Sequence, residues 1–176
     1  GLKFIGANSK LEFLYDKPIF TTLKVKEFKQ FLFKKAIKNG AKDLIGTSVT
    51  HPIVRNNKVI GVQYSGLDGS GEAFADVVVD ATGVSGILAS QLGLRDNKKF
   101  AKFLGSGSEF LMEKMNLSSD DYFQFYVGSK HIPHGYAWIF PTESDEAKIG
   151  VCWADQFSKK ITDKSLMSFL YQFISN

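Results

Sequence analysis

The 176-residue sequence predicts an α+β protein whose two parts meet near residue 95. Three observations favour this class. A single long amphipathic pattern lies early in the chain, short strand patterns separated by turn residues follow it, and the second half is rich in strand-forming aromatic residues. We therefore expect a helix and a β-meander in residues 1–95, and a larger antiparallel sheet with a final helix in residues 96–176.

An N-terminal hairpin and a helix are the first expected elements. Leu11 and Phe13 alternate with polar residues, and the Asp and Pro within residues 16–18 predict the hairpin turn. Over residues 26–39, apolar side chains recur at spacings of three and four, and Gly40 follows as a natural helix stop. This pattern predicts an amphipathic helix that packs on a sheet.

Several short strands are expected after the helix. Turn residues delimit strand patterns over residues 47–54, 58–65 and 72–75, and their close spacing predicts an antiparallel meander. Residues 76–81 include three consecutive valines, which predicts a strand buried on both faces. A short helix is expected next, over residues 84–92.

The second half is predicted to form the larger sheet. Its expected strands cover residues 100–112, 122–127, 136–140 and 148–153. Thr162 is a suitable N-cap for a final helix. The apolar face of that helix would carry Leu166, Phe169, Leu170 and Phe173.

Composition and charge narrow the partners. The chain carries a net charge of +4, but only Arg55 and Arg95 are arginine, the residue best suited to base edges and phosphates. We therefore expect no nucleic-acid partner, and we interpret the lysines of the first 60 residues as a solvated face. Contact of this face with anionic lipid or with a pyrophosphate remains open. Cys152 is the single cysteine, which predicts a reducing compartment such as the cytosol. No Cys/His cluster has zinc spacing, so no metal site is expected.

One short motif has the composition of a ligand-binding turn. Asp80, Thr82 and Gly83 follow the valine run, at the carboxyl end of the expected buried strand. Open sheets leave a crevice for ligands at such ends. Glycine there lets the backbone approach a phosphate or a ribose closely.

The order of these elements, together with one aromatic stretch, resembles a known family. Residues 135–141 read Gly-Tyr-Ala-Trp-Ile-Phe-Pro, and residues 148–151 read Lys-Ile-Gly-Val. This stretch is similar to the Tyr-x-Trp-x-Phe-Pro signature, and the glycine-bearing strand after it, of the geranylgeranyl reductase family within the p-hydroxybenzoate hydroxylase-like flavoproteins. The resemblance covers roughly residues 20–155.

The resemblance implies a substrate site on the aromatic stretch. Tyr136, Trp138, Phe140 and Pro141 would line the cavity that holds an isoprenoid chain near the flavin ring. Alternate aromatic residues on one strand make a long apolar wall, which suits a hydrocarbon. From the residues alone, a strand in the core of a sandwich explains the same alternation equally well.

The resemblance also implies FAD as the cofactor. Val49 matches a position whose backbone approaches the adenine end of FAD, and the Asp80–Gly83 turn matches one near the ribose and pyrophosphate. The family has an arginine at the position of Val25, and we expect Lys24 or Lys26 to supply the positive charge instead.

The function that the resemblance implies is FAD-dependent reduction of isoprenoid double bonds, including those of archaeal lipids. No Gly-x-Gly-x-x-Gly opens this sequence. We therefore expect an internal piece of a longer flavoprotein, inactive by itself, whose partners are its flanking segments and an isoprenoid lipid. No catalytic residue is assigned. The alternatives are a flavin-dependent hydroxylase or halogenase on the same scaffold, and a non-catalytic module that binds lipid or protein.

Other reactive side chains are expected to be structural. His131 and His134 lie in a loop and are expected to face solvent. Cys152 lies on an expected strand, where a buried inert thiol is typical. Ser85 lacks the spacing of a hydrolase nucleophile.

Overall fold

The structure is a computed structural model that describes residues 1–117, 122–154 and 162–175. Contacts divide the chain into two compact units. The sheet unit comprises residues 1–28 and 102–176, and the meander unit comprises residues 29–101. This division differs from the expected boundary at residue 95 chiefly because the first 28 residues belong to the sheet unit.

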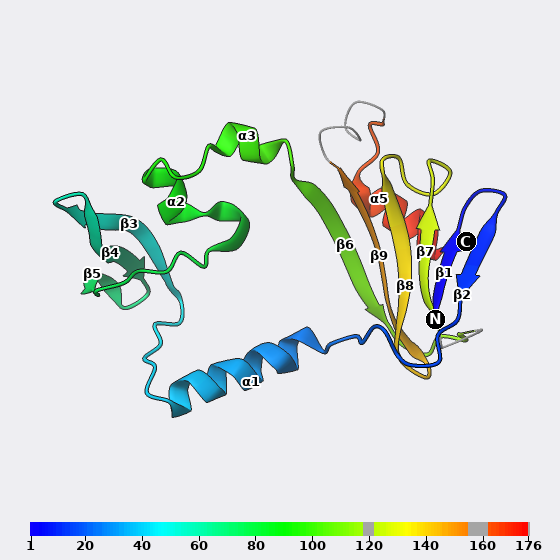
Figure 1. The fold of residues 1–176 in the computed structure, drawn as a ribbon, viewed down its shortest axis with the longest axis horizontal. Helices are drawn as coiled ribbons and strands as arrows, with labels where there is room; N and C mark the ends of the chain where they lie inside the picture. Colours follow the sequence, from blue (N-terminus) through cyan, green and yellow to red (C-terminus); the bar gives the residue numbers. More distant parts are fainter. Residues whose placement is uncertain (118–121, 155–161, 176) are drawn as a thin grey trace. The chain divides into compact units, whose positions relative to one another are not determined.

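A six-stranded sheet forms the centre of the sheet unit (Figure 1). Its strands in spatial order are β2 (Lys10–Phe13), β1 (Leu2–Ile5), β7 (Phe123–Val127), β8 (Gly135–Glu143), β9 (Glu146–Ala154) and β6 (Gly105–Met112). β1 runs parallel to β7, and every other neighbouring pair is antiparallel. The four strands expected in the second half are confirmed, but β6 begins at Gly105 and not at residue 100, because residues 100 and 101 belong to helix α3 (Asn97–Ala101). The sheet is mixed rather than wholly antiparallel, because β1 pairs with β7.

The N-terminal hairpin turns earlier than expected. Its turn spans residues 6–9, where the Gly6 amide donates a hydrogen bond to the Ser9 carbonyl at 2.8 Å. The expected turn at residues 16–18 is wrong, because Leu11 and Phe13 belong to the second strand of the hairpin and not to the first. Residues 14–24 instead run without regular secondary structure to the end of β8, where the Thr22 hydroxyl donates to the Pro141 carbonyl.

Helix α5 (Leu166–Ile174) covers one face of this sheet (Figure 1). The core between α5 and the sheet comprises Ile132, Ala137, Ala147, Ile149, Val151, Trp153 and Leu170, all buried. The helix begins after Ser165, whose hydroxyl accepts a hydrogen bond from the Ser168 amide at 3.1 Å. The expected cap, Thr162, lies one turn too early and accepts from the Lys164 amide. An N-cap must lie directly before the first helical residue, and Ser165 meets this requirement.

The meander unit contains a three-stranded antiparallel sheet in the order β3 (Thr47–Arg55), β4 (Lys58–Gly66) and β5 (Gly69–Phe74). Asn56 and Asn57 join β3 to β4, and both have positive φ angles (50° and 60°). Two such residues form the tight turn whose twist matches that of the flanking strands. The expected meander is confirmed.

The strand expected over residues 76–81 is not formed. Val77 and Val79 are 75% and 79% exposed, and residues 76–81 pair with no strand of the sheet. A buried strand requires a hydrogen-bonded neighbour on each side. Within the described part of the meander unit, the sheet contains only β3, β4 and β5. A short helical turn at Gly83–Ser85, α2 (Ile87–Gln91) and α3 (Asn97–Ala101) complete the unit.

Helix α1 (Val25–Lys38) confirms the expected amphipathic helix in its position. All of its residues are described, and none of them is buried. Packing of this helix on a sheet is therefore not observed in this structure. Among the residues that the structure describes, no helix is both long enough and apolar enough to cross a lipid bilayer.

Candidate functional site

Strand β8 sends alternate side chains to opposite faces of the sheet. Ala137 and Ile139 pack in the core under α5, and Ala137 is fully buried. Tyr136, Trp138 and Phe140 therefore point to the other face, because side chains alternate along a strand. Tyr136 remains 39% exposed. The core under α5 and the aromatic side chains of β8 thus occupy different faces of the sheet.

Aromatic rings from four adjacent strands make a continuous surface on this second face. The surface is called the aromatic wall here and comprises Phe4, Phe13, Phe123, Phe125, Tyr136, Trp138 and Phe140. The ring of Phe125 lies 5.1 Å from the rings of both Phe4 and Phe140. Trp138 lies 5.7 Å from Tyr136 and 5.9 Å from Phe140. These centroid distances are those of favourable aromatic pairs.

Gly150 on β9 allows the Trp138 indole to lie across the sheet. It is the direct cross-strand partner of Trp138. A Cβ atom added to Gly150 would lie only 2.1 Å from an indole carbon. The glycine after the aromatic signature therefore has a structural reason, since any larger residue would displace the ring.

Polar groups border the wall on the side of β6 and β9. The Trp138 indole N–H donates to a Glu109 carboxylate oxygen at 3.1 Å. Lys148 Nζ lies 4.0 Å from the other Glu109 oxygen and donates to the Leu23 carbonyl at 3.0 Å. Sequence reasoning missed Glu109, because its contact with Trp138 joins residues 29 positions apart and has no local signal.

Cys152 lies beside the wall rather than in the core. It is the cross-strand partner of Tyr136 and is half-buried, not fully buried as expected. Burial raises the pKa of the Tyr136 hydroxyl above its usual value, and a hydrogen bond with the Cys152 thiol adds to the shift. The Tyr136 hydroxyl is therefore protonated at neutral pH and adds no charge to the wall.

Pro141 occupies the opposite face from the other expected substrate residues. It pairs with Ala147, which is fully buried in the core. The alternation along β8 therefore points the Pro141 ring away from the aromatic wall. The structure brings Tyr136, Trp138 and Phe140 together on one surface and separates Pro141 from them.

In the meander unit, Asp80 and Thr82 organise a compact turn. The Asp80 carboxylate accepts hydrogen bonds from the Thr82 hydroxyl (2.6 Å), the Thr82 amide (3.1 Å) and the Ala89 amide (2.9 Å). These bonds, the one from the Thr82 hydroxyl first, lower the pKa of Asp80 from 3.8 to about 2. The Thr82 hydroxyl accepts in turn from the Ile87 amide at 2.9 Å. Both side chains thus act on the turn itself.

The turn keeps one side of its backbone open. Gly83 has a φ of +63°, and a Cβ atom there would meet nothing within 4 Å. Gly86 differs, because a Cβ atom there would lie 2.4 Å from the Arg95 guanidinium. Arg95 donates to the Val84 and Ser85 carbonyls at 2.8 and 2.7 Å and so holds the turn. Sequence reasoning did not assign Arg95 a role, although arginine is rare in this chain.

The turn leaves space for a ligand group to approach its backbone at Gly83. The open space beside Gly83 leaves room for a phosphate or a ribose against the backbone. Val49 lies half-buried on β3 of the same unit. Val49 and the Asp80–Gly83 turn, which are both expected at the cofactor, therefore belong to the same unit.

Lys24 and Val25 belong to the sheet unit instead. The Lys24 ammonium is paired with the Glu143 carboxylate, and this hydrogen bond raises the pKa of Lys24 above its usual value. Val25 is the first residue of α1 and is 45% exposed. Lys24, which precedes the family's arginine position at Val25, is thus already paired with the Glu143 carboxylate.

The loop histidines differ from each other. His134 is exposed, as expected. His131 is half-buried, and its Nε2 atom is buried, so the expected solvent-facing position is wrong for this residue. The cause is packing of its ring against Tyr126, at a centroid distance of 5.5 Å. Within the described residues, no group of three or more His, Cys, Asp or Glu side chains is arranged to hold a metal ion.

Comparison with known sequences identifies the second half of the chain. Residues 104–176 match the geranylgeranyl reductase catalytic domain. A digeranylgeranylglycerophospholipid reductase from Haloferax volcanii is 34% identical over 149 residues, which are 81% of this chain and 35% of that protein. The chain thus spans well under half the length of this curated relative.

Comparison with solved structures agrees on the fold. A geranylgeranyl bacteriochlorophyll reductase-like protein from Thermoplasma acidophilum superimposes with a TM-score of 0.83 at 23% identity, over 100% of this chain and 45% of that one. The flavin-dependent brominase Bmp2 superimposes less well, with a TM-score of 0.68 at 17% identity, over 100% of this chain and 44% of that one. The chain belongs to the geranylgeranyl reductase family. It corresponds to only a part of such a protein, and this part includes residues of the catalytic domain.

Proposed function

We propose that this chain is part of an FAD-dependent reductase that saturates isoprenoid double bonds in archaeal-type membrane lipids. The names of the curated relatives support this substrate class, since they are digeranylgeranylglycerophospholipid reductases. Because the chain spans only part of these relatives, the activity would belong to a longer polypeptide. The flanking segments of that polypeptide would be the partners of both units.

The aromatic wall is the observation that carries the proposal. Its rings form one apolar surface on the sheet face that α5 does not cover. A hydrocarbon chain lying along Tyr136, Trp138 and Phe140 would gain dispersion contacts and remove apolar area from water. An isoprenoid has no strong hydrogen-bonding group along its length. A protein can therefore bind it only through apolar contacts, such as those that the aromatic wall offers. The wall would also keep water away from the reacting double bond.

The Asp80–Gly83 turn is proposed to hold the cofactor. Asp80 and Thr82 would fix the backbone through their mutual hydrogen bonds, and the open side of Gly83 would face a phosphate or the ribose. Val49 would contact the adenine end. When bound, reduced FAD supplies the hydride for reduction. Lys24 would assist only after release from Glu143, so we assign it a smaller part than the turn.

A reduction assay tests this proposal. The longer polypeptide that contains this chain, loaded with FAD and chemically reduced without oxygen, is given a geranylgeranyl glycerophospholipid. We expect the lipid to gain two hydrogen atoms per double bond, detected by mass spectrometry. Phe140→Ala should lower the rate about tenfold or more with unchanged flavin content. Reduction at the wild-type rate in this variant would contradict a substrate role for the wall.

The flavin-dependent halogenases and hydroxylases are the second candidate, because the brominase shares the fold. Enzymes of that kind consume oxygen with reduced flavin, whereas reduction of a double bond needs none. A product that appears only in air would therefore favour the alternative. A longer polypeptide that neither retains FAD nor turns over the lipid would favour a non-catalytic binding module.

We further propose that the protein meets its lipid at the surface of a membrane, in a reducing compartment such as the cytosol. Support comes from the exposed lysines of α1, Lys29, Lys34, Lys35 and Lys38, which suit an anionic surface. Sedimentation with vesicles that contain anionic lipid checks this point. We expect binding that falls as salt is raised, and binding independent of salt would contradict it.

A further inference from the structure

A cavity lies beneath α5, on the face of the sheet opposite the aromatic wall. Its volume is about 670 Å³, within the range of small-ligand sites. It is lined by Met115, Tyr126, Lys130, His131, Ile139, Ile149, Gln172, Phe173 and Ile174. All of these residues belong to the sheet unit, and none belongs to the wall. Nothing in the proposed reductase function uses this cavity.

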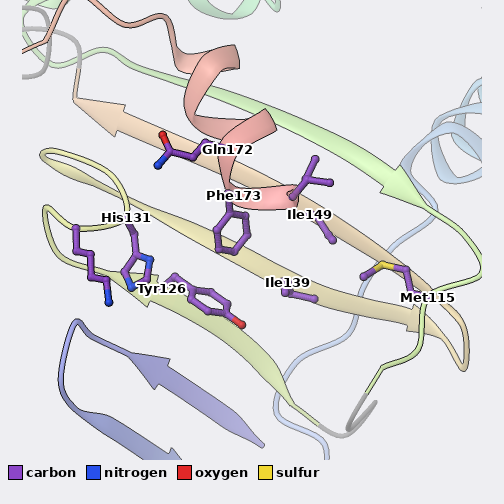
Figure 2. A pocket seen from close by; sticks show the side chains of 9 residues that line it. Met115, Tyr126, His131, Ile139, Ile149, Gln172 and Phe173 are labelled. Atoms are coloured by element: carbon purple, nitrogen blue, oxygen red, sulfur yellow. The ribbon is translucent and has the colours of Figure 1, made fainter. Parts of the chain in front are cut away.

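The cavity has one polar end. Figure 2 shows His131 and Gln172 at this end, and Lys130 also lines the cavity. The Nε2 atom of His131 is buried and has no hydrogen-bond partner among the described residues. Buried polar atoms in folded proteins nearly always have a partner. The His131 side chain is therefore left with a binding capacity that this part of the chain does not use.

Neighbouring rings fix the position of His131. The Tyr126 ring packs edge-on against it at 5.5 Å and against Phe173 at 4.8 Å. The Tyr126 hydroxyl donates to the Gln124 side chain at 3.1 Å, so its proton is already used. His131 is thus held in place by apolar contacts while its Nε2 atom stays unsatisfied.

The opposite end of the cavity is apolar. Figure 2 shows Phe173 descending from α5, with Ile139 and Ile149 on the strands below and Met115 at the far side. Ile149 is only 3% exposed. A hydrocarbon placed against these side chains would leave water without requiring any hydrogen bond. The cavity therefore joins a cationic, donor-bearing end to an apolar end.

We propose that this cavity binds a single-chain anionic amphiphile. Its acid group would accept a hydrogen bond from His131 Nε2–H and would lie near the Lys130 ammonium. Its hydrocarbon would lie against Met115, Ile139 and Phe173. A carboxylate and a phosphate monoester share this chemistry, because each presents an anionic oxygen to a donor. The site is independent of the flavin and of the aromatic wall.

Calorimetric titration of the 176-residue chain with three ten-carbon probes tests the proposal. The probes are decanoate, decyl phosphate and decanol, which carry different head groups on alkyl chains of nine or ten carbons. We expect one or both anions to bind about tenfold or more tightly than decanol. Tighter binding of decanoate identifies a fatty-acid type of ligand, and tighter binding of decyl phosphate identifies a phosphate head group. Equal binding of decanol and the anions, or no binding of any probe, overturns the proposal.

Two substitutions at one position separate the head-group contact from folding. His131→Leu removes the donor and should weaken the anions about tenfold, with little change for decanol. His131→Gln keeps a side-chain N–H donor and should restore most of the affinity, which a merely structural role of the histidine does not predict. Unfolding of both variants is followed by circular dichroism. Anion affinity that is unchanged in a folded His131→Leu variant overturns the proposal.

A wall variant locates the bound probe. Trp138→Ala lies on the opposite face of the sheet and should leave decanoate and decyl phosphate binding within a factor of about two. Loss of anion binding in this folded variant would mean that the probes occupy the wall, and it would overturn the assignment to the cavity.

Discussion

The two faces of the six-stranded sheet are built from the same strands and have opposite characters. Between α5 and the sheet, Ala137, Val151 and Leu170 are fully buried and belong to the core of the unit. On the other face, rings such as Tyr136 and Trp138 pack against one another and remain partly exposed. Because side chains alternate along a strand, each of β7, β8 and β9 contributes to both faces at once. Neighbouring residues of one strand therefore supply the core on one face and the proposed ligand surface on the other.

The largest expected effect concerns the covered face. Leu170→Ala opens a cavity between α5 and β9 and should cost about 2–5 kcal/mol in the free energy of unfolding. The aromatic wall has no contact with this side chain, so the affinity for an isoprenoid lipid should stay unchanged under conditions where the variant is folded. Urea unfolding and a lipid titration check the two expectations. A loss of lipid affinity in the folded variant would contradict the separate roles assigned to the two faces.

Gly150→Ala is expected to lower both the stability of the fold and the affinity for lipid, because residue 150 lies under the Trp138 ring of the aromatic wall. The added Cβ would lie 2.1 Å from the Trp138 indole and would force the ring to move, at a cost of about 1–3 kcal/mol. We also expect weaker lipid binding, because the displaced indole breaks the continuous surface. The fluorescence spectrum of Trp138 reports the movement of the ring. A wild-type spectrum and wild-type stability would contradict the proposed reason for this glycine.

Adjacent residues of β8 offer a matched pair with smaller effects. Ile139→Val, on the covered face, should cost about 0.5–1.5 kcal/mol and leave lipid affinity unchanged. Phe140→Leu, on the wall, removes ring contacts with Phe123 and Phe125 and should weaken lipid binding about tenfold. Thermal unfolding and lipid titration of both variants give the comparison. Equal effects on lipid binding would show that the faces do not act separately.

Acid should destabilise the Asp80–Gly83 turn of the meander unit, which belongs to neither face of the six-stranded sheet. The hydrogen bond from the Thr82 hydroxyl, followed by those from backbone amides, lowers the pKa of Asp80 from its ordinary value of 3.8 to about 2 in the folded chain. Its hydrogen bonds therefore stabilise the turn at pH values above about 4, and this contribution is lost as the pH falls toward 2. We expect the Ala89 and Thr82 amides to lose protection from hydrogen exchange over this range, beyond the general effect of acid.

Asp80→Asn is the control for that titration. The neutral amide cannot gain a proton, so the additional loss of protection at low pH should disappear. Exchange at Val151, in the core of the sheet, should not follow the Asp80 titration. An Asp80→Asn variant with an unchanged pH profile would show that another group controls the turn.

Local patterns predicted most of the elements of this fold. The helix at Val25–Lys38, the meander and the strands of the second half each have a periodic pattern or turn residues within a few positions. Pairing of β1 with β7 joins Leu2 to Phe123 and leaves no local signal. The valine run at residues 76–81 was misinterpreted, because strand composition cannot form a strand without a neighbouring strand edge.

The candidate site was also predicted only in part, because local patterns identify some of its residues and long-range pairing supplies the others. The aromatic signature identified Tyr136, Trp138 and Phe140, and the turn motif identified Asp80 and Thr82 as residues that act together. The signature also includes Pro141, which the strand register places on the other face. Partners supplied by distant strands, such as Glu109 and Phe4, depend on tertiary pairing. A one-dimensional pattern does not contain that information.

Fluorescence of two single-tryptophan variants tests the central claim most directly, that the aromatic wall binds an isoprenoid chain. The sequence contains only two tryptophans, Trp138 on the wall and Trp153 in the core. Trp153→Phe leaves Trp138 as the reporter, and Trp138→Phe leaves Trp153. Titration with a geranylgeranyl glycerophospholipid should give a saturable spectral change from Trp138 and none from Trp153. A change from Trp153 alone, or from neither residue in folded protein, would contradict the account.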